Sequence, residues 1–213
     1  ASAGCVLSRV TNSPKPAVCT PRTFRRPEPG TTVNPPATAY AARIAALHRE
    51  LGLPADYAIR RRLALQPEAD EAALLTIATP PDSPPVRLTP PAAAAWTRLR
   101  QSAQADGVAL EPLSGFRSVN RQVEIIRRKR DAGQPLAAIL ASVAAPGYSE
   151  HHTGHALDLG TPGEPELEEG FALTSAYRWL RDHARDHGFH LSYPRDNPHG
   201  IVFEPWHWCW RQA

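Results

Sequence analysis

The stretch SEHHTGHALDL, which runs from Ser149 to Leu159, concentrates residues that bind metal ions. It holds three of the nine histidines of the chain, which are followed by one carboxylate, Asp158, between two leucines. Imidazole nitrogens and carboxylate oxygens are common ligands of zinc, and two histidines with one carboxylate leave a tetrahedral zinc ion one open position for water. The stretch therefore indicates a metal site, to which only some of these side chains contribute.

A helical pair of histidine ligands is disfavoured here. His151 and His155 are four residues apart, a spacing that would place both on one face of a helix. Gly154 lies between them and Pro146-Gly147 comes shortly before, so helix propensity is poor. The HExxH pattern of helical zinc proteases is also absent. We expect Gly154 to adopt a backbone conformation that a side chain would forbid.

The residues HALDL fit a strand better than a helix. Leu157 and Leu159 would share the face that meets the core, while Asp158 points the opposite way beside the small Ala156. A carboxylate between core leucines needs a partner, because an unpaired buried charge is costly. A metal cation would serve, and an ion pair with one of the many arginines is the alternative for an isolated aspartate.

Two further segments carry side chains suited to hydrolysis. Near the C-terminus, EPWHW places His207 as a third ligand candidate and Glu204 as a carboxylate able to take a proton from an activated water. Arg117, in SGFRS, follows a predicted strand and Gly115, and its planar guanidinium can hold a carboxylate or polarise a carbonyl. A surface ion pair is the alternative for Arg117. Together, the candidate metal ligands, the carboxylate of Glu204 and the guanidinium of Arg117 predict cleavage of an amide by activated water.

Helical and strand patterns alternate without a regular repeat, which predicts an α+β fold. From apolar spacing we expect helices at 38–52, 89–107, 118–131, 135–143 and 174–187, with Thr38, Thr89 and Ser118 as N-caps. We expect short strands at 73–78, 108–116, 155–159, 189–193 and 201–204.

The first part of the chain differs from the rest. Residues 1–37 are rich in proline and lack apolar periodicity, which predicts an irregular arm before a domain at 38–213. A disulfide between Cys5 and Cys19 would staple this arm, and lipid modification of Cys5 is the alternative. Cys209 is expected to be a buried small hydrophobe. Since the chain contains no methionine, we expect that a signal segment has been removed and that the protein is exported to the periplasm or cell envelope.

Composition excludes two classes of protein. The chain of 213 residues is 42% hydrophobic and 21% charged, which is close to globular averages. No apolar run reaches the roughly 18 residues of a membrane span, so no transmembrane segment is expected. The basic runs at 60–62 and 127–130 lack interleaved aromatic residues, so we interpret them as solvated faces and expect no nucleic-acid partner.

Three motifs together resemble the VanY-type D-alanyl-D-alanine carboxypeptidases, zinc peptidases whose fold is shared with the hedgehog signalling domain. They are SGFRS with a glutamine five residues after its arginine, then PGYSEHHTGHALDL, then FEPWHW. The patterns SxHxxGxAxD and ExWH are met in full by the second and third motifs. The resemblance covers about residues 88–210 and implies a hedgehog/DD-peptidase-like fold, with a small central antiparallel sheet flanked by helices. The predicted helix at 38–52 lies outside it as an N-terminal extension.

The resemblance also implies roles for individual residues. It assigns His151, Asp158 and His207 as zinc ligands and Glu204 as the catalytic acid/base. It implies that Arg117 lies near the scissile carbonyl or the terminal carboxylate of the substrate. The further substrate-binding residues that it implies are Gln122, Ser149, Tyr193 and Trp206.

The function that the resemblance implies is a zinc-dependent D,D-carboxypeptidase that removes the terminal D-Ala from peptidoglycan stem peptides. The alternatives within the family are an L,D-carboxypeptidase, a D,D-dipeptidase and a peptidoglycan endopeptidase. A non-catalytic zinc-containing cell-wall binding module is a further alternative, which the presence of Glu204 disfavours. Phe116 departs from relatives that often carry tyrosine, and His152 and His155 are expected to stay off the metal.

Overall fold

The computed structural model describes residues 35–79 and 84–212, together with Ala1. Cys5 and Cys19, and hence their predicted disulfide, lie outside the described residues.

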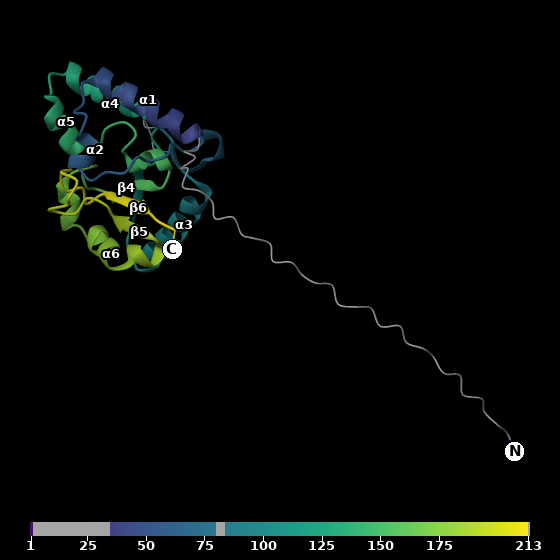
Figure 1. The fold of residues 1–213 in the computed structure, drawn as a ribbon. Helices are drawn as coiled ribbons and strands as arrows, with labels where there is room; N and C mark the ends of the chain where they lie inside the picture. The colour runs from purple at the N-terminus through teal and green to yellow at the C-terminus, as the bar shows by residue number, and fades with distance from the viewer. Residues whose placement is uncertain (2–34, 80–83, 213) are drawn as a thin grey trace. The chain divides into compact units, whose positions relative to one another are not determined.

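The domain is α+β (Figure 1). Its α-helices are α1 (Pro35–Leu51), α2 (Tyr57–Arg60), α3 (Pro90–Ala105), α4 (Val119–Asp131), α5 (Leu136–Ser142) and α6 (Ser175–His183). Its strands are β1 (Leu75–Ala78), β2 (Val86–Leu88), β3 (Glu111–Ser114), β4 (Ala156–Gly160), β5 (Phe189–Leu191) and β6 (His207–Trp210). Its 3-10 helices are η1 (Glu71–Ala73), η2 (Glu150–Thr153), η3 (Glu169–Leu173) and η4 (Ala184–His187).

The central element is a four-stranded antiparallel sheet with the strand order β3-β4-β6-β5. Strand β4 therefore has a neighbour on each side. Asp158 on β4 pairs with Ser114 of β3 and with His207 of β6. Strands β1 and β2 form a separate antiparallel pair. Three segments that are distant in sequence thus meet at the position of Asp158.

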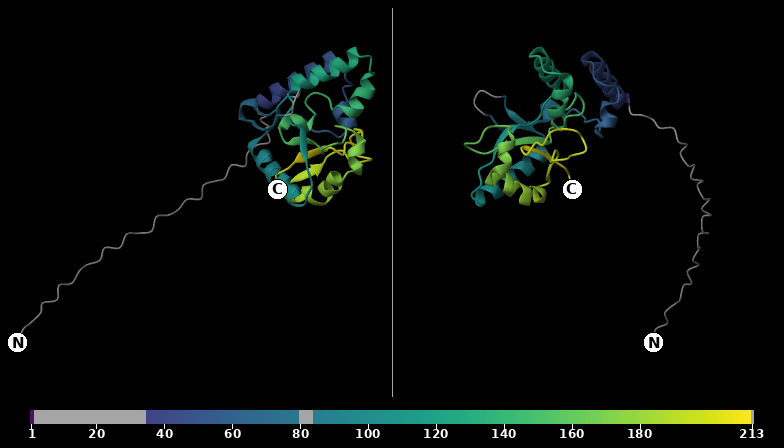
Figure 2. Two further views of the ribbon diagram at one scale, coloured as in Figure 1. Left: turned by 180° about the vertical axis from the view of Figure 1, so that it is seen from behind. Right: turned by 90° about the vertical axis from the view of Figure 1, so that its left-hand side faces the viewer.

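Two hydrophobic clusters form the core of the domain. In Figures 1 and 2, helices α1 and α4 lie on one side of the sheet and α3 and α6 on the other. The larger cluster joins the sheet to α3 and α6, and it includes Leu157 and Leu159, which are fully buried as predicted. The smaller cluster packs α1 and α2 against α4 and α5, with Leu51 and Ile126 among its members. The segment at 38–52 is thus a packed part of the domain.

The helix predictions are confirmed in most of their extent. Ser118 precedes α4, and its Oγ accepts a hydrogen bond from the backbone N–H of Arg121 at 3.1 Å, which is an N-cap. The prediction that Thr38 caps the first helix is wrong, because α1 already begins at Pro35. Proline suits a first helical turn, where the N–H that it lacks would have no intrahelical partner. Thr89 flanks α3 in an extended conformation, but its side chain makes no capping hydrogen bond.

One predicted strand is wrong, and two strands, β2 and β6, were missed. The segment 201–204 is not a strand; Val202 N donates to Ala141 O and Glu204 N donates to Tyr193 O, which are isolated contacts with two different segments. The strand lies a few residues later, at β6, where it pairs with both β4 and β5. Its sequence HWCW is rich in aromatic residues, which favour strands. The other predicted strands are present, and most are shorter than expected.

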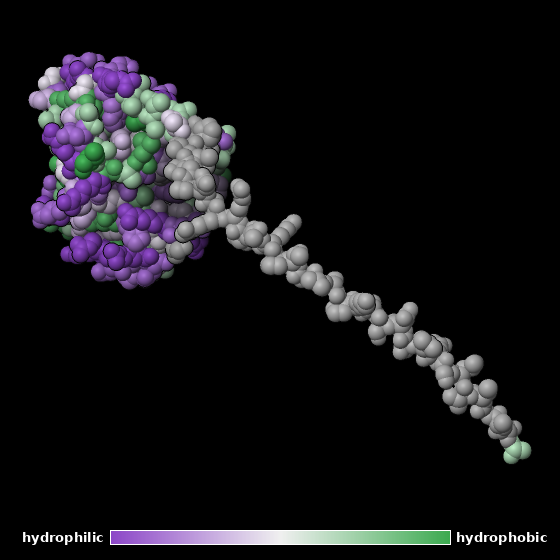
Figure 3. Space-filling model, viewed as in Figure 1, coloured by the Kyte–Doolittle hydropathy of each residue, from purple (hydrophilic) through white to green (hydrophobic). Residues whose placement is uncertain are grey.

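The surface of the domain is mixed in character. Figure 3 shows small hydrophobic areas scattered among hydrophilic residues on the face in view. Within the described part of the chain, no helix is both long and apolar enough to cross a membrane.

Candidate active site

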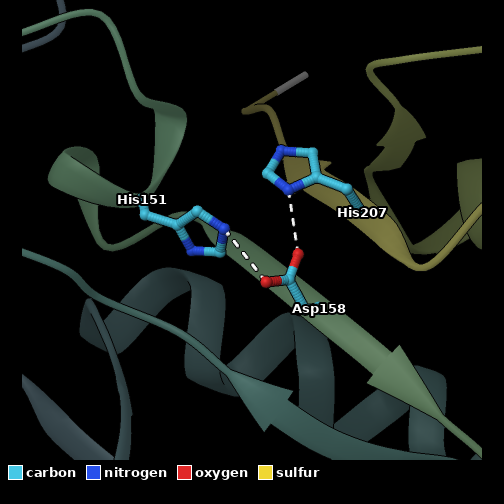
Figure 4. Close-up of side chains that lie close together, drawn as sticks. All are labelled: His151, Asp158 and His207. Atoms are coloured by element: carbon cyan, nitrogen blue, oxygen red, sulfur yellow. Dashed lines mark hydrogen bonds and ion pairs between the residues drawn. The ribbon is translucent and has the colours of Figure 1, made fainter. Parts of the chain in front are cut away.

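Two histidines and one aspartate form a cluster of potential metal donors (Figure 4). His151 comes from η2, Asp158 from β4 and His207 from β6, and all three are buried. One donor atom from each lies within 4.8 Å of the others. Nε2 of His151 is 3.2 Å from Oδ2 of Asp158, and Nδ1 of His207 is 2.9 Å from Oδ1 of the same carboxylate. The three side chains that the sequence predicts as ligands therefore converge.

The orientation of His151 is set by the backbone beneath it. Its Nδ1–H donates to the carbonyl oxygen of Gly115 at 2.6 Å, so the lone pair of Nε2 faces the cluster. A Cβ atom at Gly115 would lie 2.6 Å from the carbonyl oxygen of Arg87, which no side chain tolerates. Gly154 ends η2 with a φ of 67°, the left-handed conformation predicted from the sequence. Both glycines thus help to position this histidine.

His207 lies between two carboxylates. Nδ1 faces Asp158, and Nε2 is 3.0 Å from Oε2 of Glu150. Because Glu150 accepts the Nε2 proton, the lone pair of Nδ1 can point toward a metal ion. Glu150 was not singled out from the sequence, since the pattern SxHxxGxAxD leaves its position free. The signal that would have found it is a carboxylate directly before a proposed ligand.

The charges of this cluster fit a bound cation. Burial raises the pKa of Asp158, but His151 and His207 outweigh burial and hold the pKa well below its usual range. Burial likewise acts against ionisation of Glu150, yet its hydrogen bond to His207 lowers the pKa to about 2. For His207, burial lowers the pKa, and the two carboxylates more than reverse this and raise it to about 10. Without a metal ion, a proton on His207 balances two carboxylates, and a divalent cation bound at Nδ1 would take over that role.

Glu204 is a second buried carboxylate beside this cluster. Its backbone carbonyl accepts a hydrogen bond from the N–H of His207 at 3.1 Å, and its N–H donates to Tyr193 O at 3.1 Å. These bonds join it to β6 and to the segment after β5. Burial raises the pKa of Glu204 to about 7, although the charge of His207 acts in the opposite direction. A carboxyl with such a pKa can both accept and donate a proton near neutral pH.

Arg117 lies at the same site, on the loop between β3 and α4. Nη2 is 3.9 Å from Oδ2 of Asp158 and 3.3 Å from Oγ of Ser114, while Nη1 donates to Oε1 of Gln122 at 3.3 Å. Gln122 is fully buried, and its amide donates to Ala144 O at 2.6 Å. This hydrogen-bond network holds the guanidinium beside the metal cluster.

A cavity of about 360 Å³ joins these residues. Its walls include all nine side chains predicted as site residues, the three ligand candidates among them: Arg117, Gln122, Ser149, His151, Asp158, Tyr193, Glu204, Trp206 and His207. The ring of Tyr193 lies 4.9 Å from that of His207, centroid to centroid. The geometry therefore brings the predicted residues to one place, while their roles stay predictions.

The other two histidines of the stretch lie elsewhere. His152 is fully buried, and both ring nitrogens bond to backbone: Nδ1 to Arg117 O at 2.6 Å and Nε2 to Gly147 N at 3.1 Å. His155 packs edge-on against Trp210 at a centroid distance of 5.2 Å. Phe116 is not among the residues that line the cavity. Neither of these two histidines belongs to the donor cluster.

Comparison with solved structures defines the class of fold. The domain is similar to the LD-carboxypeptidase LdcB, with a TM-score of 0.60 and 26% identity over 70% of this chain and 74% of that chain. It is also similar to the D,D-pentapeptidase VanY from a VanB-type resistance cassette, in a structure of a glutamate-to-alanine mutant in complex with Zn(II). For this pair the TM-score is 0.54, and the identity is 28% over 70% of this chain and 82% of that chain. The domain therefore has the fold of the LdcB- and VanY-type DD-peptidases.

The family follows from the sequence comparison. The family model "VanY: D-alanyl-D-alanine carboxypeptidase" matches residues 85–213, and the chain belongs to this family. A D-alanyl-D-alanine carboxypeptidase of Enterococcus faecalis is 33% identical over 120 residues, which is 52% of this chain. The match spans 43% of that protein, so the chain covers less than half the length of this curated relative.

Proposed function

We propose that this protein is a zinc-dependent D,D-carboxypeptidase that removes the terminal D-Ala from peptidoglycan stem peptides. The observation that carries the proposal is the convergence of His151, Asp158 and His207 within 4.8 Å, in a cavity that Glu204 also lines. Membership of the VanY family and the similarity to a VanY structure in complex with Zn(II) support the choice of metal and reaction. Since stem peptides lie outside the cytoplasm, the proposal includes export to the periplasm or cell envelope.

In this proposal, the three clustered side chains hold the zinc ion through Nε2 of His151, one Oδ of Asp158 and Nδ1 of His207. A bound zinc ion supplies a water of lowered pKa and polarises the scissile carbonyl. Glu204 takes the proton of the attacking water on its carboxylate and then donates it to the amine of the departing D-Ala. A pKa of about 7 suits both steps, because the group gains and loses a proton near the working pH.

Arg117 stabilises negative charge on the substrate in this account. Its guanidinium is held by Gln122 and Ser114 and faces the cavity, where it can bond to a developing oxyanion or to the terminal carboxylate of the peptide. Because the group is fixed before the substrate arrives, little reorganisation is needed during the reaction. Ser149, Tyr193 and Trp206 are among the other residues that line the cavity, and in this proposal they contact the peptide.

An L,D-carboxypeptidase is the second candidate, favoured by the similarity to LdcB. Incubation of the zinc-loaded protein with defined stem pentapeptide and tetrapeptide, followed by mass spectrometry, separates the two. We expect release of one free D-Ala from the pentapeptide and no shortening of the tetrapeptide. Shortening of the tetrapeptide alone would establish the L,D-enzyme, release of a D-Ala-D-Ala dipeptide would establish a D,D-dipeptidase, and cleavage of internal bonds alone would establish an endopeptidase.

A further inference from the structure

The four residues of the basic run at 127–130 on α4 have two different environments. Arg127 forms an ion pair with Glu50, and Arg130 donates to Leu51 O at 3.0 Å, so these two fasten α4 to α1. Arg128 and Lys129 instead line the candidate active-site cavity. The sequence-based interpretation of this run as a solvated face is therefore incomplete, because half of it reaches the cavity.

The charges along the cavity are segregated. Its two carboxylates, Asp158 and Glu204, both lie at the metal cluster, where Arg117 also stands. Beyond that end, the charged lining residues are Arg128 and Lys129. Among the described residues, neither has a carboxylate within 4 Å, whereas Arg121 and Arg127 on the same helix do. The end of the cavity away from the metal cluster thus presents two cations without an ion-pair partner in this part of the chain.

The length of α4 indicates where along a peptide these cations would act. Gln122 lies at the metal end, because it bonds to Arg117, and Ile125 continues the cavity wall one turn further on. From Gln122 to Arg128 the helix rises about 9 Å, at 1.5 Å per residue. An extended peptide covers that distance in roughly three residues. A carboxypeptidase leaves one residue on the departing side of the scissile bond, so a contact about three residues away falls on the side that is retained.

We propose that Arg128 and Lys129 form a subsite for a substrate carboxylate two or three residues upstream of the scissile bond. This inference rests on the proposed function. A stem peptide offers two such groups: the α-carboxylate of a second residue linked through its side chain, and the side-chain carboxylate of a diaminopimelate third residue. Guanidinium and ammonium groups bind carboxylates through charge-assisted hydrogen bonds. A stem peptide with an amide in place of the carboxylate, or with lysine in place of diaminopimelate, cannot form these bonds.

Binding to a zinc-loaded Glu204→Ala variant tests the subsite without turnover. The probes are L-Ala-γ-D-Glu-diaminopimelate-D-Ala-D-Ala and two forms of it, one amidated at the second residue and one at the side-chain carboxylate of the third. We expect one amidation to raise Kd about tenfold, since a hydrogen bond to a charged group is worth about that factor. Adding Arg128→Ala and Lys129→Ala should raise Kd for the free peptide by a similar factor and abolish the difference between free and amidated forms. The amidation that matters identifies which carboxylate is bound.

The matched control replaces Arg98 and Arg178 by alanine in the same background. Both are exposed, neither lines the cavity, and the change in net charge is the same. This control should keep the full discrimination between the free and amidated peptides. Equal affinity of the Glu204→Ala parent for all three peptides, or the same discrimination after removal of Arg128 and Lys129, would overturn the subsite. Release of D-Ala by the chain with Glu204 intact reports separately on the proposed function, so the two failures are distinguishable.

Discussion

Asp158 and His207 occupy directly paired positions on the adjacent antiparallel strands β4 and β6, and Nδ1 of His207 lies 2.9 Å from Oδ1 of Asp158. The two residues are 49 positions apart in sequence. Side chains alternate between the faces of a strand, so a slip of one residue in this pairing would turn His207 to the opposite face. The register of the sheet therefore decides whether the candidate metal cluster exists.

Replacement of Asp158 by alanine should remove most of the bound zinc. The variant loses the one carboxylate that faces both histidines, and the remaining two donors are too few for a stable zinc site. Metal content per chain after dialysis, measured by atomic emission, checks this. His155→Ala is the matched control, because His155 packs against Trp210 outside the cluster, and it should retain zinc. Full zinc in Asp158→Ala together with loss in His155→Ala would place His155 among the ligands.

Substitutions at Glu150 should weaken zinc binding in a graded way. Glutamine keeps an oxygen that accepts the Nε2 proton of His207 but removes the charge, whereas leucine removes both. We expect zinc affinity to fall in the order parent, Glu150→Gln, Glu150→Leu, with a loss of about 10–100-fold for leucine, as for other partners of metal-ligating histidines. Competition with a chromophoric chelator measures this. Equal affinity of the leucine variant and the parent would show that Glu150 does not orient His207.

The ligand candidates could be found from the sequence because they lie in short motifs. The alternation of HALDL predicts that Asp158 and the flanking leucines face opposite ways, and both leucines are fully buried. Glu150 escaped the same reasoning because its partner, His207, is 57 positions away in sequence. Only the pairing of β4 with β6 brings the two together, and β6 itself was missed. Long-range partners of this kind depend on topology, which local patterns do not reveal.

Acid should destabilise the domain through His152. Its Nδ1–H donates to Arg117 O and its Nε2 accepts from Gly147 N–H, a pattern that needs the neutral ring. Burial lowers the pKa of His152 to about 4 from an ordinary value of 6.5. Because the pKa is lower in the folded state, this contribution is complete above about pH 6.5 and is lost as the pH falls through 4. Over that window it amounts to about 3 kcal/mol.

A comparison of the parent with His152→Gln isolates this effect from other histidines. The free energy of unfolding is measured in urea at pH 7.5 and pH 4.5, with a chelator present so that metal loss does not contribute. The decrease on acidification should be smaller in the variant by about 2–3 kcal/mol. An equal decrease in the free energy of unfolding in both proteins would contradict a lowered pKa of His152 in the folded state.

For the fold, as for the site, the features that depend on local sequence could be predicted and those that depend on distant contacts could not. Helix α4 was predicted with nearly its full extent, because its apolar spacing and the Ser118 cap are local. The segment 201–204 was predicted as a strand from its apolar residues, yet its backbone bonds to α5 and to Tyr193 and not to a neighbouring strand. The division of the basic run of α4 was also hidden, since it depends on where α1 packs. Local propensity thus located the helices better than the partners of the strands.

The role of Glu204 is the centre of this account, and the substitution Glu204→Ala tests it most directly. Glu204 is predicted to transfer protons and not to bind metal, so the variant should keep the zinc content of the parent. Its rate of D-Ala release from stem pentapeptide should fall by about 10²–10⁴-fold, the usual contribution of a general acid–base group. The measurement is D-Ala release per zinc-loaded chain, with metal content determined on the same sample. Release at the rate of the parent from a variant with full zinc would contradict the proposed mechanism.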